Sequence, residues 1–426
     1  MCGGSGRPDG QARGSLPLRV LLLSHLYPRP SDPGQAPFIR RQVAELRARG
    51  AEFTVLSPVP SAPRIPAWTP RLRSALAESR ATPGSWEVDG VAVRAPRYLK
   101  LPAALDLGLF GPLYYFGVRS EVRRLVRSTR FDLIHAQMLV PDGYAAARLG
   151  CELGVPSVVT ERGYLSVLAG RRVQRRPIRW AVEHSDQCVF VANALASLAA
   201  SFGKPARPFR VVCTGVDVTE FGRIPRDQAR KTLGLPLSAC LLLHVGRNDP
   251  RKGVGELLEV FGEIRAFEPA LMLAYLGRGS EDGHLKNRAA ELGIASSVLV
   301  AGAKPHNEVA TWLAACDIVV HPSKRVAEGL PNALVEAGAA SRAVVASRTA
   351  GIPEVIEDGT TGLLVEPENY TELKQAILSL VRDEGRRTAM GEAGRRLVEQ
   401  KFSWARHADE MLEVYKSVLR TDGRLH

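Results

Sequence analysis

Two carboxylates and a glycine-containing turn lie close together in the last quarter of the chain. Seven residues separate Glu328 from Glu336, and Gly329 and Pro331 follow the first carboxylate directly. Gly and Pro predict a loop there, and the pattern from Asn332 predicts a helix that begins right behind it. Free N–H groups at a helix start attract an anion such as phosphate. Since carboxylates also accept hydrogen bonds from sugar hydroxyls, the stretch predicts a nucleotide-sugar site; the alternative is a helix end with two solvated acids.

A second candidate is the loop from Val245 to Gly253, which follows a strand pattern and opens a helix. Gly246 allows a tight turn, and Arg247 and Lys252 place two positive charges in the same loop. At the carboxyl edge of a parallel sheet, two such side chains could clamp a diphosphate. The alternative is an ordinary basic surface loop.

Two further loops follow strand patterns in this half, Gly277–Ser280 and Ala301–His306, and the second contains Lys304. The carboxyl ends of parallel strands share one edge of a sheet. We therefore expect these loops to converge on one cleft with the loop that carries Arg247.

Polar residues also follow strand patterns in the N-terminal half. They are Gly34 in a Pro- and Gly-rich loop, His135, Asp142, and Arg162 after Thr160 and Glu161. His135 could bind a ligand or take part in catalysis, or it could be a buried histidine with satisfied hydrogen bonds. Asp142 could equally cap a helix.

The elements that must position these residues alternate between strand and helix. The opening order is a strand at Leu18–Leu23, a helix at Phe38–Arg49 and a strand at Glu52–Leu56, which is typical of a βαβ unit in a parallel sheet. Asp89 and Gly90 predict a hairpin turn. The alternation restarts after residue 239, so the chain is predicted to be an α/β protein with two doubly wound, Rossmann-like domains.

The composition agrees with two domains. A chain of 426 residues is too long for one ordinary core. No apolar run reaches the roughly 18–20 residues that span a bilayer. None of the six cysteines belongs to a Cys-x-x-Cys pair, which favours reduced thiols, mostly buried, and a cytoplasmic location. The expected division is residues 1–17 as a disordered lead-in, 18–217 as one domain, 218–238 as a linker, 239–402 as the second domain and 403–426 as a C-terminal helix.

The positive charge is concentrated in the N-terminal half. Residues 1–205 contain 28 Lys and Arg against 15 Asp and Glu, whereas the remainder contains 29 of each. Arginines recur on a predicted helix, 120–128, beside the apolar segment 101–118, and again at Arg171, Arg172, Arg175 and Arg176. A basic helix beside an apolar patch is typical of contact with an anionic membrane surface; the alternative is a buried helix followed by a solvated one. A phosphorylated acceptor is another candidate, and no nucleic-acid motif accompanies the charge.

The motifs together resemble the retaining GT-B-fold glycosyltransferases of family 4, over residues 19–419. The most specific matches are VGRNDPRKG at 245–253, EGLPNALVE at 328–336 and AGIPEVIEDGTTGLLV at 350–365. The resemblance implies a nucleotide-sugar-binding C-terminal domain, an acceptor-binding N-terminal domain and a last helix that crosses back to it. It implies the following roles: Arg247 and Lys252 hold the donor diphosphate, Glu328 approaches the donor sugar, Gly246, Gly329, Leu330 and Asn332 complete the donor site, Glu336 binds the ribose, and Lys304 lies near the base.

The N-terminal half is similar to a subgroup that builds cell-surface polysaccharides, of the teichuronic type. The matching segments are APFIRRQ at 36–42, APRY at 95–98, IHAQ at 134–137 and PDGY at 141–144. One position departs from this subgroup. Where its members carry a His-Gly pair that contacts the reacting sugar, this chain has Arg162-Gly163. Arginine can orient a hydroxyl or a phosphate, but it is a poor general base.

The resemblance implies a metal-independent, cofactor-free hexosyltransferase. Such an enzyme moves a sugar from a nucleotide-diphosphate donor to a polyisoprenoid-linked or growing surface glycan. We expect it in the cytoplasm, peripherally on the inner membrane face. A nucleotide-sugar epimerase of the same fold is a weaker alternative, because those enzymes carry other loop signatures. Arg162 motivates a third hypothesis, a catalytically impaired subunit that binds sugar nucleotides as a scaffold.

Overall fold

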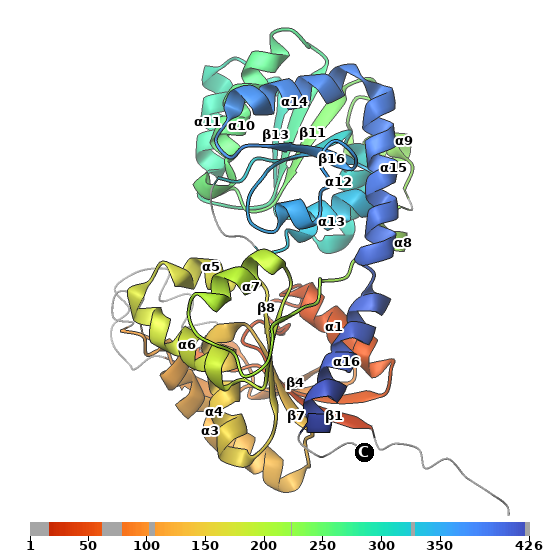
Figure 1. Cartoon of the computed structure of the whole chain (residues 1–426). Coiled ribbons are helices and arrows are strands. Elements are labelled where there is room, and N and C mark those ends of the chain that lie inside the picture. Colours follow the sequence, from red (N-terminus) through yellow and green to blue (C-terminus); the bar gives the residue numbers. More distant parts are fainter. Residues whose placement is uncertain (1–16, 62–78, 102–106, 223, 325–328, 422–426) are drawn as a thin grey trace, which may run out of the picture.

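The computed structural model describes residues 17–61, 79–101, 107–222, 224–324 and 329–421. Each half of the chain is an α/β unit built around one sheet (Figure 1). The C-terminal sheet is parallel, and the N-terminal sheet is parallel except for one antiparallel pair at its edge. No helix in these described ranges is both long and apolar enough to cross a membrane.

The N-terminal sheet has the strand order β10-β9-β8-β7-β1-β2-β5-β4. Its strands are β1 (Leu18–Leu23), β2 (Ala51–Leu56), β4 (Ser85–Val88), β5 (Val91–Arg94), β7 (Leu133–Gln137), β8 (Ser157–Glu161), β9 (Gln187–Phe190) and β10 (Arg210–Val211). A separate pair joins β3 (Val59–Ser61) to β6 (Arg97–Leu99). The predicted hairpin is confirmed, because β4 and β5 pair antiparallel around Asp89 and Gly90, both with positive φ.

Helices cover both faces of this sheet. Alternate strand residues point to opposite sides, so the apolar residues of each side pack against their own layer of helices. Val20 and Leu22 face α1 (Pro37–Arg47) and α16 (Trp404–Thr421), whereas Leu21 and Leu23 face the other layer. The helices of that layer are α3 (Phe110–Ser128), η2 (Leu139–Gly143), α4 (Tyr144–Leu153), α5 (Tyr164–Ala169), η3 (Arg172–Gln174), α6 (Arg175–His184) and α7 (Asn193–Ala200).

The C-terminal sheet has six parallel strands in the order β13-β12-β11-β14-β15-β16. They are β11 (Cys240–Val245), β12 (Leu271–Leu276), β13 (Val298–Gly302), β14 (Ile318–His321), β15 (Ala343–Ser347) and β16 (Gly362–Val365). The surrounding helices are η4 (Pro250–Lys252), α10 (Val254–Arg265), α11 (Asp282–Glu291), η5 (Ala295–Ser297), α12 (His306–Ala315), α13 (Asn332–Ala339), η6 (Ile352–Glu354), α14 (Tyr370–Arg382) and α15 (Glu384–Lys401).

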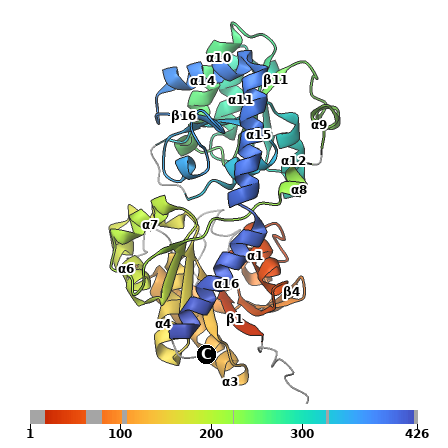
Figure 2. The same cartoon turned by 45° about the vertical axis from the view of Figure 1, so that its right-hand side comes forward.

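The last helix crosses back to the N-terminal half, as the sequence predicts. Figures 1 and 2 both show α16 lying along the N-terminal sheet next to α1. Its buried side chains pack with Val20 and Leu133, and the Tyr415 hydroxyl lies 2.7 Å from His135 Nδ1. The chain therefore closes one half with an element from the end of the other.

One helix differs from the sequence predictions in its starting residue. Helix α3 begins at Phe110, ten residues before the predicted helix. Pro112 lies in its first turn, where no backbone N–H is needed. Gly117 is required because a Cβ there would lie 2.4 Å from Tyr98 Cβ. The expected linker forms α8 (Val218–Phe221) and α9 (Arg226–Leu233), and the fully buried Arg230 of α9 donates to Asp317 at 2.6 Å.

The described cysteines form no disulfide. Cys188 and Cys316 are buried, Cys213 and Cys240 are half-buried, and Cys151 is exposed. Burial raises the pKa of the Cys188 and Cys316 thiols to about 12, so both are protonated and unreactive at neutral pH.

Candidate active site

A cleft cavity between the two halves brings together most of the predicted donor residues. Arg162, Gly163, Ser166 and Val167 line it from the N-terminal half. The C-terminal half contributes Val245, Gly246, Arg247, Arg251, Lys252, His321, Gly329, Leu330, Pro331, Asn332 and Ala333. The loop that carries Arg247 and the turn before Asn332 thus meet the Arg162 turn in one space, whereas the predicted loops 277–280 and 301–306 do not line this cavity.

Close backbone packing holds the loop of Arg247 and Lys252 in place. Gly246 has φ 154° and Gly277 has φ 149°. A Cβ on Gly277 would lie 1.7 Å from the Gly246 carbonyl oxygen, so only glycine permits this approach. On the other side, a Cβ on Gly253 would lie 2.2 Å from the Pro322 carbonyl oxygen. Neighbouring backbone therefore fixes both ends of the loop.

One cation of this loop is paired with a carboxylate of the same loop. Arg251 donates to Asp249 at 2.7 and 2.8 Å, and this pairing lowers the pKa of the Asp249 carboxyl. Asp249 also accepts from the Arg251 backbone N–H at 2.9 Å, which caps η4. Arg247, which is exposed, and Lys252, which is half-buried, line the cleft cavity together with Arg251.

The predicted helix N-terminus faces the same cavity. Helix α13 begins at Asn332, and no side chain of the described residues caps it. The turn before it touches the other half of the molecule, because a Cβ on Gly329 would lie 2.6 Å from the Arg162 carbonyl oxygen. Glu328, the predicted partner of the donor sugar, lies outside the described residues. The surroundings thus suit an anionic group between α13 and Lys252.

Arg162 is held by uncharged oxygen atoms. Its Nε donates to Gln137 Oε1 at 2.7 Å, one terminal nitrogen donates to Thr214 Oγ1 at 3.2 Å, and the other donates to the Gln42 side chain. The ring of Phe38 lies 5.1 Å from the guanidinium carbon. Burial lowers the pKa of Arg162 to about 10, so it keeps its charge at neutral pH. The cleft therefore contains a fixed cation whose direct hydrogen-bond partners are neutral.

A buried carboxylate that the sequence did not single out shapes this turn. Glu161 is 1% exposed and accepts from the backbone N–H groups of Leu139, Gly163 and Leu165 at 2.9, 2.8 and 2.9 Å. Burial raises the pKa of the Glu161 carboxyl, and the three N–H donors oppose that rise. Glu161 thus positions Arg162 and Gly163 through the backbone.

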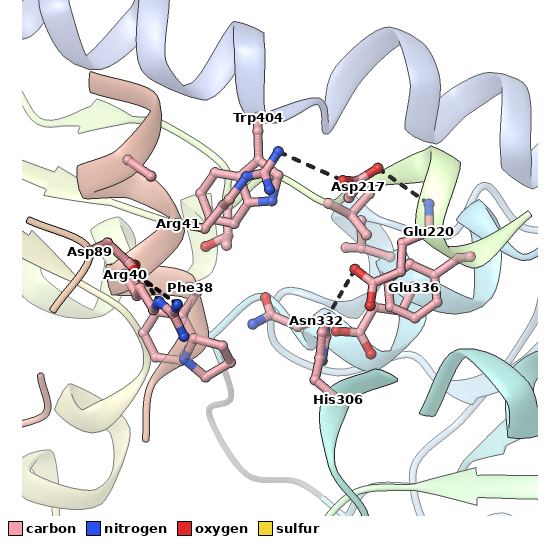
Figure 3. Close-up of a pocket in the computed structure, with 17 residues that line it drawn as sticks. Phe38, Arg40, Arg41, Asp89, Asp217, Glu220, His306, Asn332, Glu336 and Trp404 are labelled. Carbon is pink, nitrogen blue, oxygen red and sulfur yellow. Dashed lines mark hydrogen bonds and ion pairs between the residues drawn. The ribbon is translucent and has the colours of Figure 1, made fainter. Parts of the chain in front are cut away.

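A second, hinge cavity adjoins the first, because Asn332 lines both (Figure 3). Its walls come from α1, α8, α13 and the start of α12. Residues 214–217, where the chain passes to the C-terminal half, and Trp404, where it returns, complete them. Figure 3 shows Glu336, Glu220 and His306 on one side of it and Arg40 and Phe38 on the other. The two cavities together offer adjoining spaces for a nucleoside and a diphosphate.

Glu336 is the predicted ribose ligand, and it lines the hinge cavity. Burial raises the pKa of its carboxyl, which the charge of His306 opposes and that of Glu220 reinforces. His306 Nε2 lies 3.9 Å from Glu220 Oε2. Across the cavity, Arg40 binds Asp89 at 2.5 Å and Arg41 lies 3.7 Å from Asp217. A ligand hydroxyl in the cavity that donates a hydrogen bond to Glu336 therefore stabilises the charged form of its carboxylate.

Three predicted residues do not line these two cavities. His135 is fully buried between Thr160 Oγ1 at 2.9 Å and the Tyr415 hydroxyl at 2.7 Å, which is the arrangement of the second alternative, a buried histidine with satisfied hydrogen bonds. Burial, with the charge of Arg162, lowers the pKa of His135 to about 3. Gly34 lies in an exposed turn, and Lys304 pairs with Glu308 at 3.6 Å.

A polar cluster at the end of β1 escaped the sequence analysis. His25 Nδ1 lies 2.7 Å from Asp142 Oδ2, the backbone N–H of His25 donates to the same carboxylate at 3.1 Å, and the Tyr114 hydroxyl donates to it as well. Asp142 is fully buried, whereas the His25 side chain is 18% exposed. In the sequence only Asp142 indicated a polar site here. His25 could not be linked to it, because the two residues lie 117 positions apart.

The chain matches two family models. The model described as Glycosyltransferase Family 4 matches residues 34–220, and the model described as Glycosyl transferases group 1 matches residues 225–397. The two matched ranges contain both walls of the cleft cavity.

Similar proteins include named glycosyltransferases. The chain is 30% identical to D-inositol 3-phosphate glycosyltransferase 1 of Catenulispora acidiphila over 308 residues, which cover 68% of this chain and 73% of the relative. It is 25% identical to the putative teichuronic acid biosynthesis glycosyltransferase TuaC of Bacillus subtilis, over 95% of this chain and 100% of the relative. The structure of HepE from Anabaena in complex with UDP-glucose has a TM-score of 0.71 at 20% identity, over 94% of this chain and 100% of HepE.

The chain belongs to the family 4 (group 1) glycosyltransferases and has their GT-B fold. It is an enzyme of the glycosyltransferase class, in a family for which retention of the sugar's anomeric configuration is typical.

Proposed function

We propose that this protein is a metal-independent glycosyltransferase that moves a sugar from a nucleotide-diphosphate donor to a lipid-linked or growing cell-surface glycan, with retention of configuration. The observation that carries the proposal is the cleft cavity, where Arg247 and Lys252 face the start of α13. The hinge cavity, with Glu336, adjoins it at Asn332.

In this proposal the donor lies across both cavities. The diphosphate occupies the space between Lys252 and α13, and the ribose hydroxyls donate to Glu336. The bond between the anomeric carbon and the diphosphate oxygen breaks as the acceptor hydroxyl approaches from the same face. The diphosphate oxygen takes the acceptor proton, so no side-chain base is required. Fixed positive charge stabilises the leaving diphosphate in the transition state.

The acceptor side rests on Arg162 and on the names of relatives. Arg162 lines the cleft cavity and its backbone contacts Gly329, and its desolvated guanidinium fits an acceptor that carries a phosphate or another anion. Relatives named for inositol 3-phosphate and for teichuronic acid fit the same class.

The alternative is a scaffold subunit that binds sugar nucleotides without turnover. Arg162, in place of the family's usual histidine, motivates it. The test combines two measurements on the purified chain. Nucleoside diphosphates are first screened for a rise in melting temperature, because a ligand that binds the native state stabilises it. Turnover of the matching sugar nucleotides is then followed with and without a polyprenyl-phosphate-linked acceptor.

Stabilisation together with transfer supports the enzyme. Stabilisation without release of the nucleoside diphosphate under any acceptor condition supports the scaffold. The absence of stabilisation by all nucleoside diphosphates contradicts both proposals.

A further inference from the structure

His25 has a fixed place directly after β1. Its backbone N–H donates to Asp142 Oδ1 at 3.1 Å, and its carbonyl oxygen accepts from the guanidinium of Arg29 at 2.8 Å. Its ring nitrogen Nδ1 lies 2.7 Å from Asp142 Oδ2. Both backbone groups and one ring nitrogen are bonded, so the fold also sets the direction of the second ring nitrogen, Nε2.

Asp142 selects one tautomer of this ring. Its Oδ1 accepts from the His25 backbone N–H and from the Tyr114 hydroxyl, so the carboxylate is the acceptor at Oδ2 as well. Nδ1 then carries the proton, and in the neutral imidazole Nε2 has the lone pair. Among the described helices, α4 begins just after Asp142 without a side-chain cap. The buried carboxylate therefore orients His25 and does not cap a helix.

The outer edge of the His25 ring reaches solvent. The Asp142 side chain is fully buried, whereas the His25 side chain is 18% exposed. Because the Nδ1 edge faces the buried carboxylate, the exposed edge is the one that carries Nε2. No described residue hydrogen-bonds Nε2. A histidine that only compensated the buried carboxylate would need no open edge, so this arrangement favours a ligand at Nε2.

The edge of the sheet that carries His25 also borders the cleft. Strands β1, β7 and β8 are parallel neighbours, and their register, continued past the end of β1, places His25 level with Glu161. The next residue, Arg162, lines the cleft cavity. Two strand spacings separate β1 from β8, which is about 10 Å. His25 therefore lies on the N-terminal wall of the cleft, beside the turn that carries Arg162.

A groove with aromatic walls begins beside His25. The rings of His25 and Phe110 meet edge-on, with centroids 6.4 Å apart. Phe110 and Tyr164 line the groove with four leucines and two cations, and none of its described lining residues is acidic. Tyr164 directly follows Gly163, which lines the cleft cavity, so the groove and the cleft are neighbours. The groove offers flat apolar surfaces next to one fixed hydrogen-bond acceptor.

We propose that His25, held by Asp142, binds a hydroxyl group of the acceptor sugar. This inference rests on the proposed glycosyl transfer and assigns a sugar-binding residue on its acceptor side. The sugar ring packs against Phe110 and Tyr164, and one hydroxyl donates to His25 Nε2. Ligand sites commonly combine apolar and aromatic walls with a few fixed polar groups that orient the ligand. Asp142 is a positioning residue, because it acts through the ring of His25.

Modification by diethyl pyrocarbonate tests the geometry without turnover. The reagent acylates accessible, unprotonated histidine nitrogens, and peptide mass spectrometry reports each residue separately. We expect modification of His25 and of His284, which is exposed on α11, and none of the buried His135 and His407. Asp142→Asn should slow the modification of His25 about tenfold, because the new amide donates to Nδ1 and the proton moves to Nε2.

Acceptor sugars should protect His25 in the same assay. The probes are the methyl glycosides of glucose, galactose, mannose and N-acetylglucosamine. A glycoside that binds, at about twice its Kd, should slow the modification of His25 about threefold, because only the unliganded protein reacts. His284 should react as before. The proposal is overturned if His25 is unreactive in the wild type, or if none of the four glycosides protects it.

Two substitutions separate the roles of the ring nitrogens. His25→Asn keeps an N–H at the position of Nδ1 for Asp142 and has no atom at Nε2, whereas His25→Gln places an amide at Nε2. In transfer to a polyprenyl-phosphate-linked acceptor, His25→Asn should raise the acceptor KM about tenfold with kcat unchanged, because one hydrogen bond to the bound sugar is lost. His25→Gln should raise it less than about threefold. The control, His284→Asn, should match the wild type.

An acceptor KM that His25→Asn leaves unchanged overturns the proposal, and so does an equal rise in the Asn and Gln variants. Melting temperatures without ligand show whether each variant is folded. The rise in melting temperature with nucleoside diphosphate reports on the donor site separately. If that rise is absent from the wild type, the proposed function fails, whereas the modification of His25 and its protection by glycosides still decide the role of His25.

Discussion

The two walls of the cleft are built in different ways. In the C-terminal wall, short loops hold the ligand-facing groups, and the backbone of the next loop fixes each of them, as Gly277 fixes Gly246. In the N-terminal wall, a network of side chains from distant positions holds Arg162, and Gln42 lies 120 residues away from it. A site made of local loops leaves a pattern in the sequence, whereas a site made of long-range contacts leaves only single polar residues.

The largest expected effect tests the C-terminal wall. Lys252→Ala should lower kcat/KM for transfer by about 10²–10³-fold, because it removes one fixed charge from the leaving diphosphate. Arg251→Ala is the matched control. Arg251 already binds Asp249, so its loss should cost less than about tenfold. Steady-state kinetics with one sugar nucleotide measures both. Equal effects of the two substitutions would contradict the proposed role of Lys252 at the leaving diphosphate.

A smaller effect is expected in the N-terminal wall. Arg162→Gln should lower kcat/KM for an anionic acceptor by about 100-fold, since it removes a desolvated cation. The melting-temperature rise with nucleoside diphosphate should stay unchanged, because the donor is held by the other wall. The control is Arg130→Gln, an exposed arginine in the same half. A loss of donor binding in Arg162→Gln would place Arg162 on the donor side.

The side-chain network should also make stability depend on pH. His135 and His407 have their pKa lowered to about 3, by burial first and by Arg162 second. The unfolded chain binds protons below the ordinary value of about 6.5, and the folded chain does not until about pH 3. Stability is therefore complete above pH 7 and is lost as pH falls. At pH 5 we expect a loss of about 2 kcal/mol for each histidine.

Urea unfolding at pH 7 and pH 5 measures this loss. His135→Gln cannot titrate, so it should lose about 2 kcal/mol less than the wild type between the two pH values. An unchanged difference would show that His135 is protonated in the folded chain.

The smallest expected effect concerns a contact between the halves. Glu354 accepts from the backbone N–H groups of Asn193 and Ala194 at 2.7 and 2.9 Å, and so caps α7 from the other half. Glu354→Ala should cost about 1 kcal/mol of unfolding free energy. Glu357→Ala, which removes an exposed pair with Lys401, should cost under about 0.5 kcal/mol. If urea midpoints show no difference between them, the cap does not join the halves in solution.

The sequence predicts the C-terminal half of the site well. Arg247, Lys252, Gly329 and Asn332 converge as expected, because the carboxyl ends of parallel strands must share an edge. The sequence left His135 open as a ligand-binding or a buried residue, and the structure shows a core residue bonded to Tyr415 of the last helix. Its partner is 280 positions away, and no local pattern indicates it. The start of α3 was missed for a similar reason, since Gly117 is explained only by its contact with Tyr98.

The sequence alone determined the α/β class, the two-sheet organisation and the loops that carry the donor-site residues, because periodicity and turn residues act over a few positions. Only the tertiary structure decided which charges remain available. It neutralised Arg119 and Arg123 with Glu152, left Arg172 and Arg176 without a carboxylate partner among the described residues, and surrounded Arg162 with neutral partners. The physical reason is that charge depends on burial and on partners, and both are set by contacts between residues far apart in the chain.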